Sequence, residues 1–559
     1  MKIKAIDRFK RLLQVDKKDI TQVYIYAFFN GLVNLSLPIG IQAIINLIQG
    51  GDITSSWVIL VGFVIGGIAL TGILQLLQLR IVENIAQKIF SRASFEFAYR
   101  IPKIKHSELR NYYAPELANR FFDTMTIQKG LPKILIDFSL ALFQIIVGLI
   151  VLSMYHSFFV LFSFALIGLV YVIIAITGPK GLKTSITESS FKYKIAFWLE
   201  EIARSKISFK LIGNSDLNLA KSNFHVDNYL TARESHFKVL INQSLFLIGF
   251  KVIIASGLLI TGSILVFKQE MNIGQFVAAE IIIILIIASV EKLIKSLDSI
   301  YDVLTALEKI GYVADLKLDN DHKGLKIDEN ADEFPIVLDD ISFQYPDSVR
   351  PTLDNIDISI PAHTSLIIDG PSNSGKSTLL YLLAGIMSPT KGIIQYRGLP
   401  LKSLDVEHLR TFIGFSLSTN EIFQGTILEN IKMGRKDITA EYIKDALAIS
   451  RLSGFISTVP LGLKTLLDPE GQKIPRNIKN RILLARAIVN KPKLLILEDP
   501  LDHVSAYEKD IIIKDLTDTK RPWSIIVSAV DNIWHNHITN SLTLDKGIVK
   551  SFKIDNRDA

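Results

Sequence analysis

The second half of the chain contains the stretch Gly370-Pro371-Ser372-Asn373-Ser374-Gly375-Lys376-Ser377-Thr378. It matches the phosphate-binding pattern G-x-x-x-x-G-K-[ST] at every required position. The apolar run 365–368 before it predicts a buried strand, and the leucine-rich run 379–383 after it predicts a helix. Backbone N–H groups of such a loop, together with the helix N-terminus, point at phosphate oxygens. We therefore expect the whole stretch to bind ATP, with Lys376 at the β- and γ-phosphates and the Ser377 hydroxyl as a ligand of Mg²⁺.

Composition places this nucleotide site in a membrane protein. The chain has 559 residues and is 49% hydrophobic, with a mean hydropathy of +0.33. It is too apolar for an ordinary soluble enzyme and too long for one domain. Cysteine is absent, which excludes disulfides, thiolate metal sites and cysteine nucleophiles. The net charge of +7 does not indicate nucleic acid as a partner, because the basic residues cluster in loops expected beside a membrane.

Apolar stretches of about 20 residues are long enough to cross a lipid bilayer. Six of them lie near residues 22–48, 57–79, 134–154, 158–177, 244–267 and 274–291. The N-terminal segment and the two long connections are rich in Lys and Arg, whereas the short connections are nearly neutral. The positive-inside rule then predicts a multi-pass protein of the cytoplasmic (inner) membrane, with its N-terminus and its C-terminal domain in the cytoplasm.

The chain divides into four expected parts. They are an amphipathic N-terminal elbow over 1–20, a six-helix transmembrane domain over 21–315, a linker over 316–333 and a nucleotide-binding domain over 334–559. In the last part apolar runs alternate with helical stretches, which is typical of an α/β fold with a mainly parallel sheet. The expected fold class is thus an α-helical membrane domain of six transmembrane helices followed by an α/β P-loop NTPase domain.

Further motifs appear in an order that resembles ABC transporters of the exporter type, in which a membrane domain is fused to a nucleotide-binding domain. The stretch 423–431 is similar to the family pattern L-F-x-G-T-I-x-E-N-I, and 481–488 resembles the helix after the family's signature loop. The resemblance implies that Tyr345 stacks on adenine; the other interpretation is a core tyrosine at a strand end. The membrane half resembles toxin and bacteriocin exporters, and we expect it to lack the N-terminal peptidase domain that some of them carry.

Four positions depart from the family pattern. The L-S-G-G-Q signature falls on 474–478, which reads I-P-R-N-I, the Q-loop glutamine falls on Ser418 and the H-loop histidine on Ala529. The Walker B pair, Asp-Glu in the family, is inverted to Glu498-Asp499. The resemblance makes these two the catalytic residues, with Glu498 also in the Mg²⁺ shell and Asp499 one methylene too short for its task. Because a misplacement of about 1 Å can cost roughly 100-fold in rate, the sequence supports ATP binding better than hydrolysis.

The resemblance implies a dimer in which each nucleotide site uses the P-loop of one chain and the signature of the other. Two interpretations stay open. The chain is an ATP-driven exporter that works by alternating access as a homodimer or heterodimer with a second half-transporter. Alternatively, it is a regulatory or nucleotide-gated subunit that binds ATP, hydrolyses little and pairs with a competent partner. Secretion exporters of this kind also suggest a periplasmic adaptor as a further partner.

Two expectations concern the membrane half. By resemblance, the stretches 116–122 and 211–224 are coupling segments that dock on nucleotide-binding domains. Asp137, Lys251 and Glu280 lie inside apolar spans, where ionisable groups are costly, so we expect them to face the bundle interior or a wet cavity. Asp137 and Lys251 are candidates for an ion pair. Such polar groups either line a substrate pathway or serve only helix–helix contacts and snorkelling, and both interpretations stay open.

Overall fold

The structure is a computed structural model, and it describes residues 4–49, 55–110, 112–319, 324–329, 333–418 and 421–554. Its contacts define two compact units, the first formed by Met1–Pro102 and Tyr112–Leu316 and the second by Lys103–Asn111 and Lys317–Ala559. Of the linker expected over 316–333, residues 320–323 and 330–332 lie outside the described residues.

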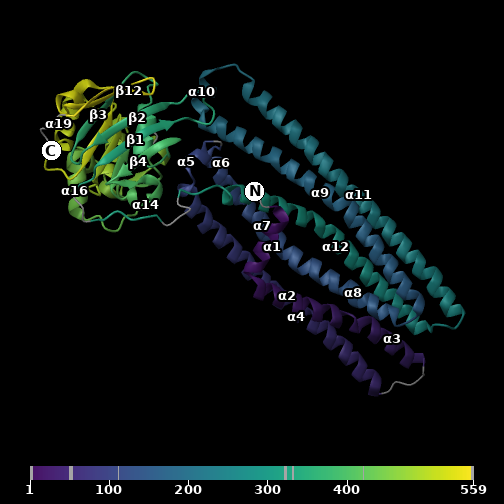
Figure 1. Ribbon diagram of the computed structural model, residues 1–559. Coiled ribbons are helices and arrows are strands. Elements are labelled where there is room, and N and C mark those ends of the chain that lie inside the picture. Colours follow the sequence, from purple (N-terminus) through teal and green to yellow (C-terminus); the bar gives the residue numbers. More distant parts are fainter. Residues whose placement is uncertain are drawn as a thin grey trace. The chain divides into compact units, whose positions relative to one another are not determined.

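The first unit is helical (Figure 1). Its main helices are α1 (Ala5–Val15), α2 (Lys17–Asn34), α3 (Ser36–Gln49), α4 (Ser55–Arg100), α6 (Ala114–Asn119), α7 (Asp123–Lys133), α8 (Ser139–Ser153), α9 (Ser157–Arg204), α10 (Lys206–Leu211), α11 (Leu217–Phe267) and α12 (Ile273–Ala314). Among the described residues, six helical stretches are long and apolar enough to cross a membrane: Lys17–Ile48, Ser55–Lys103, Ala114–Ser153, Ser157–Arg204, Leu217–Phe267 and Ile273–Ala314. The six predicted membrane helices are therefore confirmed.

Several of these helices continue far past the apolar spans that predicted them. Helix α11 has 51 residues, and at about 1.5 Å per residue it is more than twice as long as the roughly 30 Å hydrocarbon core of a bilayer. The extension carries charged and polar residues, which hydropathy alone assigns to loops. In Figure 1 α11 runs beside α9, and the two helices pack against each other along their length.

The first unit has two apolar cores, one formed mainly by side chains of α8, α9, α11 and α12 and the other mainly by side chains of α2, α4, α7 and α12. Gly148 of α8 allows close packing in the first core, because a Cβ at this position would lie 3.1 Å from Ile286 of α12. Large apolar side chains also point outward, and Phe63 of α4 is 73% exposed. Such exposure fits a surface that meets lipid.

The predicted pairing of Asp137 with Lys251 is wrong. The Lys251 Nζ instead lies 2.5 Å from Glu291 Oε2, and the same carboxylate also contacts Lys295 at 2.7 Å. Helix α12, which carries Glu291, packs directly on α11. Asp137 lies in a short π-helical segment, Ile134–Phe138, that joins α7 to α8. The sequence pattern contained no signal for which acidic residue faces Lys251.

The second unit contains two main sheets. Strands β3 (Ser365–Asp369), β6 (Ile413–Ser416), β9 (Leu494–Glu498), β10 (Ser524–Ser528), β11 (Asn540–Asp545) and β12 (Ile548–Lys553) form one sheet in the order β12-β11-β3-β10-β9-β6. All its pairs are parallel except β11 with β12. Strands β1 (Ile336–Phe343), β2 (Leu353–Ile360), β4 (Lys391–Tyr396) and β5 (Leu399–Pro400) form an antiparallel sheet that the sequence analysis did not anticipate.

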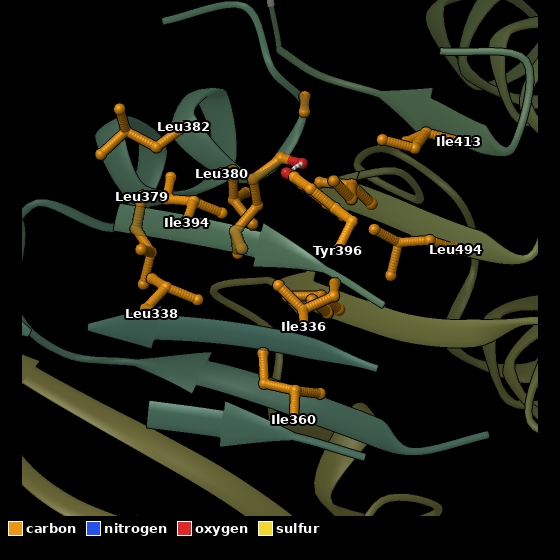
Figure 2. Packing of buried hydrophobic residues seen from close by; sticks show 14 of the residues in the cluster. Ile336, Leu338, Ile360, Leu379, Leu380, Leu382, Ile394, Tyr396, Ile413 and Leu494 are labelled. Atoms are coloured by element: carbon orange, nitrogen blue, oxygen red, sulfur yellow. Dashed lines mark hydrogen bonds between the residues drawn. The ribbon is translucent and has the colours of Figure 1, made fainter. Parts of the chain in front are cut away.

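Helices fill the space around these sheets. They are α5 (His106–Leu109), α13 (Lys376–Leu383), α14 (Val406–Leu409), α15 (Ile427–Lys432), α16 (Ala440–Ile449), α17 (Ser453–Thr458), α18 (Arg476–Ile488) and α19 (Ala506–Leu516). One core lies between α13 and strands of both sheets, and Figure 2 shows leucines of α13 facing Ile336, Ile394 and Tyr396. A second core lies around α18 and α19. The predicted fold class, six membrane helices followed by an α/β domain with a mainly parallel sheet, is confirmed.

Candidate functional site

The parallel sheet brings the expected site residues to one edge. The P-loop follows β3, Ala529 follows β10, Glu498 ends β9 and Ser418 lies just after β6. These four strands are neighbours in the order β3-β10-β9-β6 and run parallel. Their carboxyl ends therefore share one edge, which is where open α/β sheets bind ligands.

Two glycines of the P-loop are required by their surroundings. Gly370 has φ +141° and Gly375 has φ +102°, values that side-chain-bearing residues rarely adopt. A Cβ at Gly370 would lie 2.1 Å from the Leu544 carbonyl oxygen, and one at Gly375 would lie 2.7 Å from Leu353 Cδ2. The loop can therefore keep this shape only with glycine at both positions.

The polar groups of the loop fit a phosphate ligand. The Lys376 ammonium donates to the carbonyl oxygens of Gly370 at 2.7 Å and Pro371 at 2.9 Å. Ser374 is only 2% exposed, and its hydroxyl has no hydrogen-bond partner among the described residues. The N–H groups in the first turn of α13 have no acceptor inside the helix. A buried orphan hydroxyl, free N–H groups and an ammonium together form a cradle for an anion.

Tyr345, the residue expected to stack on adenine, contacts the end of the P-loop stretch. It follows β1, and its hydroxyl is 3.2 Å from Thr378 Oγ1. The Arg110 guanidinium lies 4.1 Å from the centre of the Tyr345 ring, and Phe343 packs edge-on at 4.8 Å. The side chain is partly buried and packs against the hydrophobic core of the second unit, so stacking on adenine stays a prediction beside the interpretation of a core tyrosine.

Ser418 fixes the Walker B carboxylate. Glu498 is 9% exposed, and its Oε2 accepts hydrogen bonds from the Ser418 N–H at 3.1 Å and from the Ser418 hydroxyl at 2.7 Å. The residue that replaces the Q-loop glutamine thus orients a buried acid. Over the described ranges no group of three His, Cys, Asp or Glu side chains could hold a metal by itself. That fits Mg²⁺, which is usually held by one or two carboxylates together with substrate phosphates.

Asp499 is tied to the loop after β10. Its φ is +42°, its N–H donates to the Ser528 carbonyl at 2.9 Å, and its Oδ1 accepts from the Val530 N–H at 2.9 Å. Asp499 and Ala529 both line a cavity of about 310 Å³. Ala529, at the position of the family's histidine, and Asp499, at the position of its catalytic glutamate, are therefore close together. One carboxylate oxygen of Asp499 is already hydrogen-bonded to Val530.

The signature position makes only local contacts. Pro475 is the N-cap of α18, which has no side-chain cap. An Arg476 guanidinium nitrogen lies 3.5 Å from His503 Nε2, and the Asn477 side chain accepts from the Ile478 N–H at 2.9 Å. In the family, this loop is expected to serve the site of a second chain. Its two side chains therefore contribute nothing to the P-loop of their own chain.

The two other family-like stretches meet through one arginine. Arg486 of α18 donates to the Asn430 carbonyl at 2.7 Å and to the Asn430 side chain at 3.0 Å. A capping box between Thr426 and Glu429 starts α15. Burial, with a smaller contribution from nearby Arg435, lowers the pKa of Arg486 to about 10, which leaves it charged at neutral pH.

Two contacts near the site were missed by the sequence analysis. His535 Nε2 lies 3.3 Å from Asp369 Oδ1, directly before the P-loop. The segment Lys103–Asn111 belongs to the second unit, where Lys105 N–H donates to the Lys317 carbonyl at 2.9 Å. The expected docking stretch 116–122 belongs to the first unit. Short polar segments of this kind carry no periodic signal, so their packing could not be anticipated.

Comparisons with known proteins agree with this geometry. Residues 22–290 match the family model described as ABC transporter transmembrane region, and residues 353–502 match the model described as ABC transporter. The chain belongs to the ABC transporters and carries both family regions fused in one chain, the arrangement of an exporter-type half-transporter. The resemblance identified from the motifs is confirmed.

Individual relatives match at low identity. A Bacillus subtilis probable multidrug resistance ABC transporter ATP-binding/permease protein is 26% identical over 56% of this chain and 54% of its own length. The lactococcin-A transport/processing ATP-binding protein of Lactococcus lactis is 23% identical over 92% of this chain and 72% of its own. A bacterial Atm1-family ABC exporter with ATP bound has a TM-score of 0.84, at 17% identity, covering 96% of both chains. The last comparison shows the fold.

Proposed function

We propose that the chain is an ATP-binding half-transporter that exports a substrate across the cytoplasmic membrane by alternating access, working as a dimer. The observation that carries this proposal is the P-loop cradle with Tyr345 and Glu498 in the second unit, in a chain with six membrane-crossing helices. The N-terminus and the second unit lie in the cytoplasm in this proposal, because the basic connections are on their side. A periplasmic adaptor is a further proposed partner.

The residues of the site divide the binding task. The stretch Gly370–Thr378 holds the phosphates through its backbone and Lys376. Tyr345 supports the adenine. Ser377 and Glu498 are the protein ligands of Mg²⁺, with Ser418 orienting the Glu498 carboxylate. When bound, Mg²⁺ neutralises charge on the β- and γ-phosphates. Asp499 remains the proposed acid beside the attacking water, although its Oδ1 is engaged by Val530.

The central test is nucleotide binding by the purified chain in lipid, measured beside steady-state ATPase activity. Lys376→Ala is expected to abolish ATP binding, because the ammonium is the main charge offered to the phosphates. Lys514→Ala, an exposed lysine of α19, is the matched control and should bind ATP as the unchanged chain does. Undiminished ATP affinity in Lys376→Ala would contradict the assignment of the P-loop.

A second candidate function is a nucleotide-gated subunit that hydrolyses little ATP. It is favoured by the Val530 bond that occupies Asp499, and by alanine where the family has a histidine. Asp499→Glu combined with Ala529→His separates the two functions. A strong rise in turnover in this variant would mean that the natural site is a weakened ATPase site. Unchanged turnover together with normal ATP binding would favour a nucleotide sensor.

A further inference from the structure

A second cavity, of about 440 Å³, lies wholly inside the second unit. Its walls come from the α5 segment, the end of β1, the loop after α13 and the segment before α14. The volume is in the range of about 300–1,000 Å³ that is usual for small-molecule sites. Apart from Tyr345, none of the described residues that line it is one that the motifs assign to ATP.

This cavity is separate from the phosphate site. Among the described residues that line it, none belongs to 370–378. The lining residues Gly385–Ser388 follow the C-terminal end of α13, whereas the P-loop lies at its N-terminal end. Helix α13 has 8 residues, so these ends are about 12 Å apart. Of the residues assigned to ATP, only Tyr345 forms part of the wall.

The cavity wall carries unbalanced positive charge. Lys105, Arg110 and Lys402 line it, and the carboxylate of Asp319 is the one acid among the described lining residues. Asp319 is already paired with Arg410 at 2.8 Å. Within the described part of the chain Lys105 and Lys402 form no ion pair, whereas the neighbouring Lys103 pairs with Glu407 at 2.6 Å. Three cations on the wall of one cavity attract an anion more strongly than isolated surface charges do, although Arg110 and Lys402 are themselves exposed.

The ion pair of Arg110 and the protonation state of His106 also bear on the charge of the cavity wall. Arg110 pairs with Asp347 at 3.9 Å, and the Asp347 side chain is 76% exposed, so water screens the pair. His106 stacks on Tyr381 with ring centres 5.8 Å apart. Burial lowers the pKa of His106 below its usual value, with Asp319 opposing the shift and Arg110 adding to it, so the ring is mostly neutral at pH 7. The positive charge is thus carried by two lysines and one arginine.

The rest of the wall is apolar. Phe343, Ile386, Met387, Leu404 and Val406 line it. Methionine adapts to irregular ligands because its side chain is unbranched and polarisable. A small inorganic anion would leave the apolar wall without a contact, and a purely apolar ligand would leave the cations without a counter-charge.

We propose that this cavity binds a small anionic amphiphile, with a carboxylate or phosphate among Lys105, Arg110 and Lys402 and an apolar body against Met387 and Leu404. The proposal does not rest on export or hydrolysis. It does imply a consequence for ATP, because the ligand would touch Arg110 and Tyr345, and the Tyr345 hydroxyl contacts Thr378 of the P-loop. Occupancy of the cavity should therefore change ATP affinity.

The test uses the purified full chain in nanodiscs of neutral lipid, without nucleotide, titrated calorimetrically with 2-naphthyl phosphate, 2-naphthoate and neutral 2-naphthol. We expect at least one anion to bind about 10-fold more tightly than 2-naphthol, a difference of about 1.4 kcal/mol. A preference between the two anions identifies the head group as phosphate or carboxylate. Lys105→Met with Lys402→Met, which keeps the apolar stems, should weaken anion binding by about 10-fold or more.

Matched variants make the outcome decisive. Lys514→Met with Lys550→Met removes two exposed lysines elsewhere in the unit and should leave binding unchanged. Lys376→Ala should lose ATP but keep the probe; loss of the probe would place it in the phosphate site and overturn the proposal. Unchanged anion affinity in the Lys105/Lys402 variant would also overturn it. If that variant no longer binds ATP, the single change Lys402→Met, at an exposed position, carries the same expectation.

Discussion

At the scale of single residues, the P-loop glycines match the family pattern and Ser418 departs from it. The P-loop glycines match the pattern, and the structure gives the reason, since the Leu544 carbonyl leaves no room for a Cβ at Gly370. Ser418 departs from the pattern, yet it makes two hydrogen bonds to Glu498. The first feature could be predicted from sequence because G-x-x-x-x-G-K-[ST] encodes backbone shape. The second could not, because a serine has no spacing signal that names its partner.

The first prediction concerns Gly370. Gly370→Ala should reduce ATP affinity by about 100-fold, or about 2.7 kcal/mol, because the added Cβ forces the loop away from Leu544. Binding is measured by calorimetry on the purified chain. Gly454→Ala is the control: Gly454 lies in α17 with open space around it, so alanine should be neutral or stabilise by up to about 1 kcal/mol. Equal ATP affinity in the two variants would contradict the strain argument.

The second prediction concerns Ser418. Ser418→Ala removes the hydroxyl that holds Glu498 Oε2 at 2.7 Å, so ATP affinity should fall by about 10-fold in the presence of Mg²⁺. Without Mg²⁺ the affinity should be unchanged. Ser457→Ala, which removes a hydroxyl bonded only to the Gly454 carbonyl in α17, serves as the control. A loss of affinity that is the same with and without Mg²⁺ would show that Ser418 acts on the nucleotide and not through the metal ligand.

At the scale of elements, the chain was most predictable where apolar periodicity is long. The six membrane helices and the strands around β3, β9 and β10 all come from continuous apolar runs. The antiparallel sheet was missed because β1 and β2 contain several acidic residues that interrupt their apolar pattern. The helical extension of α11 was missed because its sequence is polar. In both cases tertiary packing overrides a weak local signal.

The third prediction concerns the join between α13 and the antiparallel sheet. The Tyr396 hydroxyl, on a fully buried side chain, donates to the Leu383 carbonyl at 2.6 Å (Figure 2). Tyr396→Phe leaves that carbonyl unpaired and should cost about 1–2 kcal/mol. The thermal midpoint of the second unit should then fall by a few degrees, about 2–4 °C per kcal/mol. Tyr507→Phe, at a side chain 78% exposed, should leave the midpoint unchanged; an equal shift would contradict the role of the buried bond.

At the scale of the whole molecule, the decisive question is whether the chain works with itself or with another subunit. The sequence predicted the family and the ATP cradle because those depend on contiguous motifs. It predicted the dimer only through the resemblance, because residues that serve a second chain have no partner within their own. Arg476 and Asn477 illustrate this, since their contacts in the structure are local.

The fourth prediction is that the chain alone binds ATP but shows no robust transport-coupled ATPase activity. In a homodimer both sites would face a signature with proline in place of serine and with Arg476 and Asn477 in place of the glycines. Proline lacks the N–H, and the two side chains prevent the close approach that glycine allows.

Steady-state ATPase activity of the purified chain in lipid is the measurement, with Asp499→Asn as the variant that removes the proposed acid. Robust turnover abolished by that change would show a self-sufficient homodimer. Binding without turnover, with turnover appearing when a half-transporter with an intact signature and catalytic glutamate is added, would support a heterodimer.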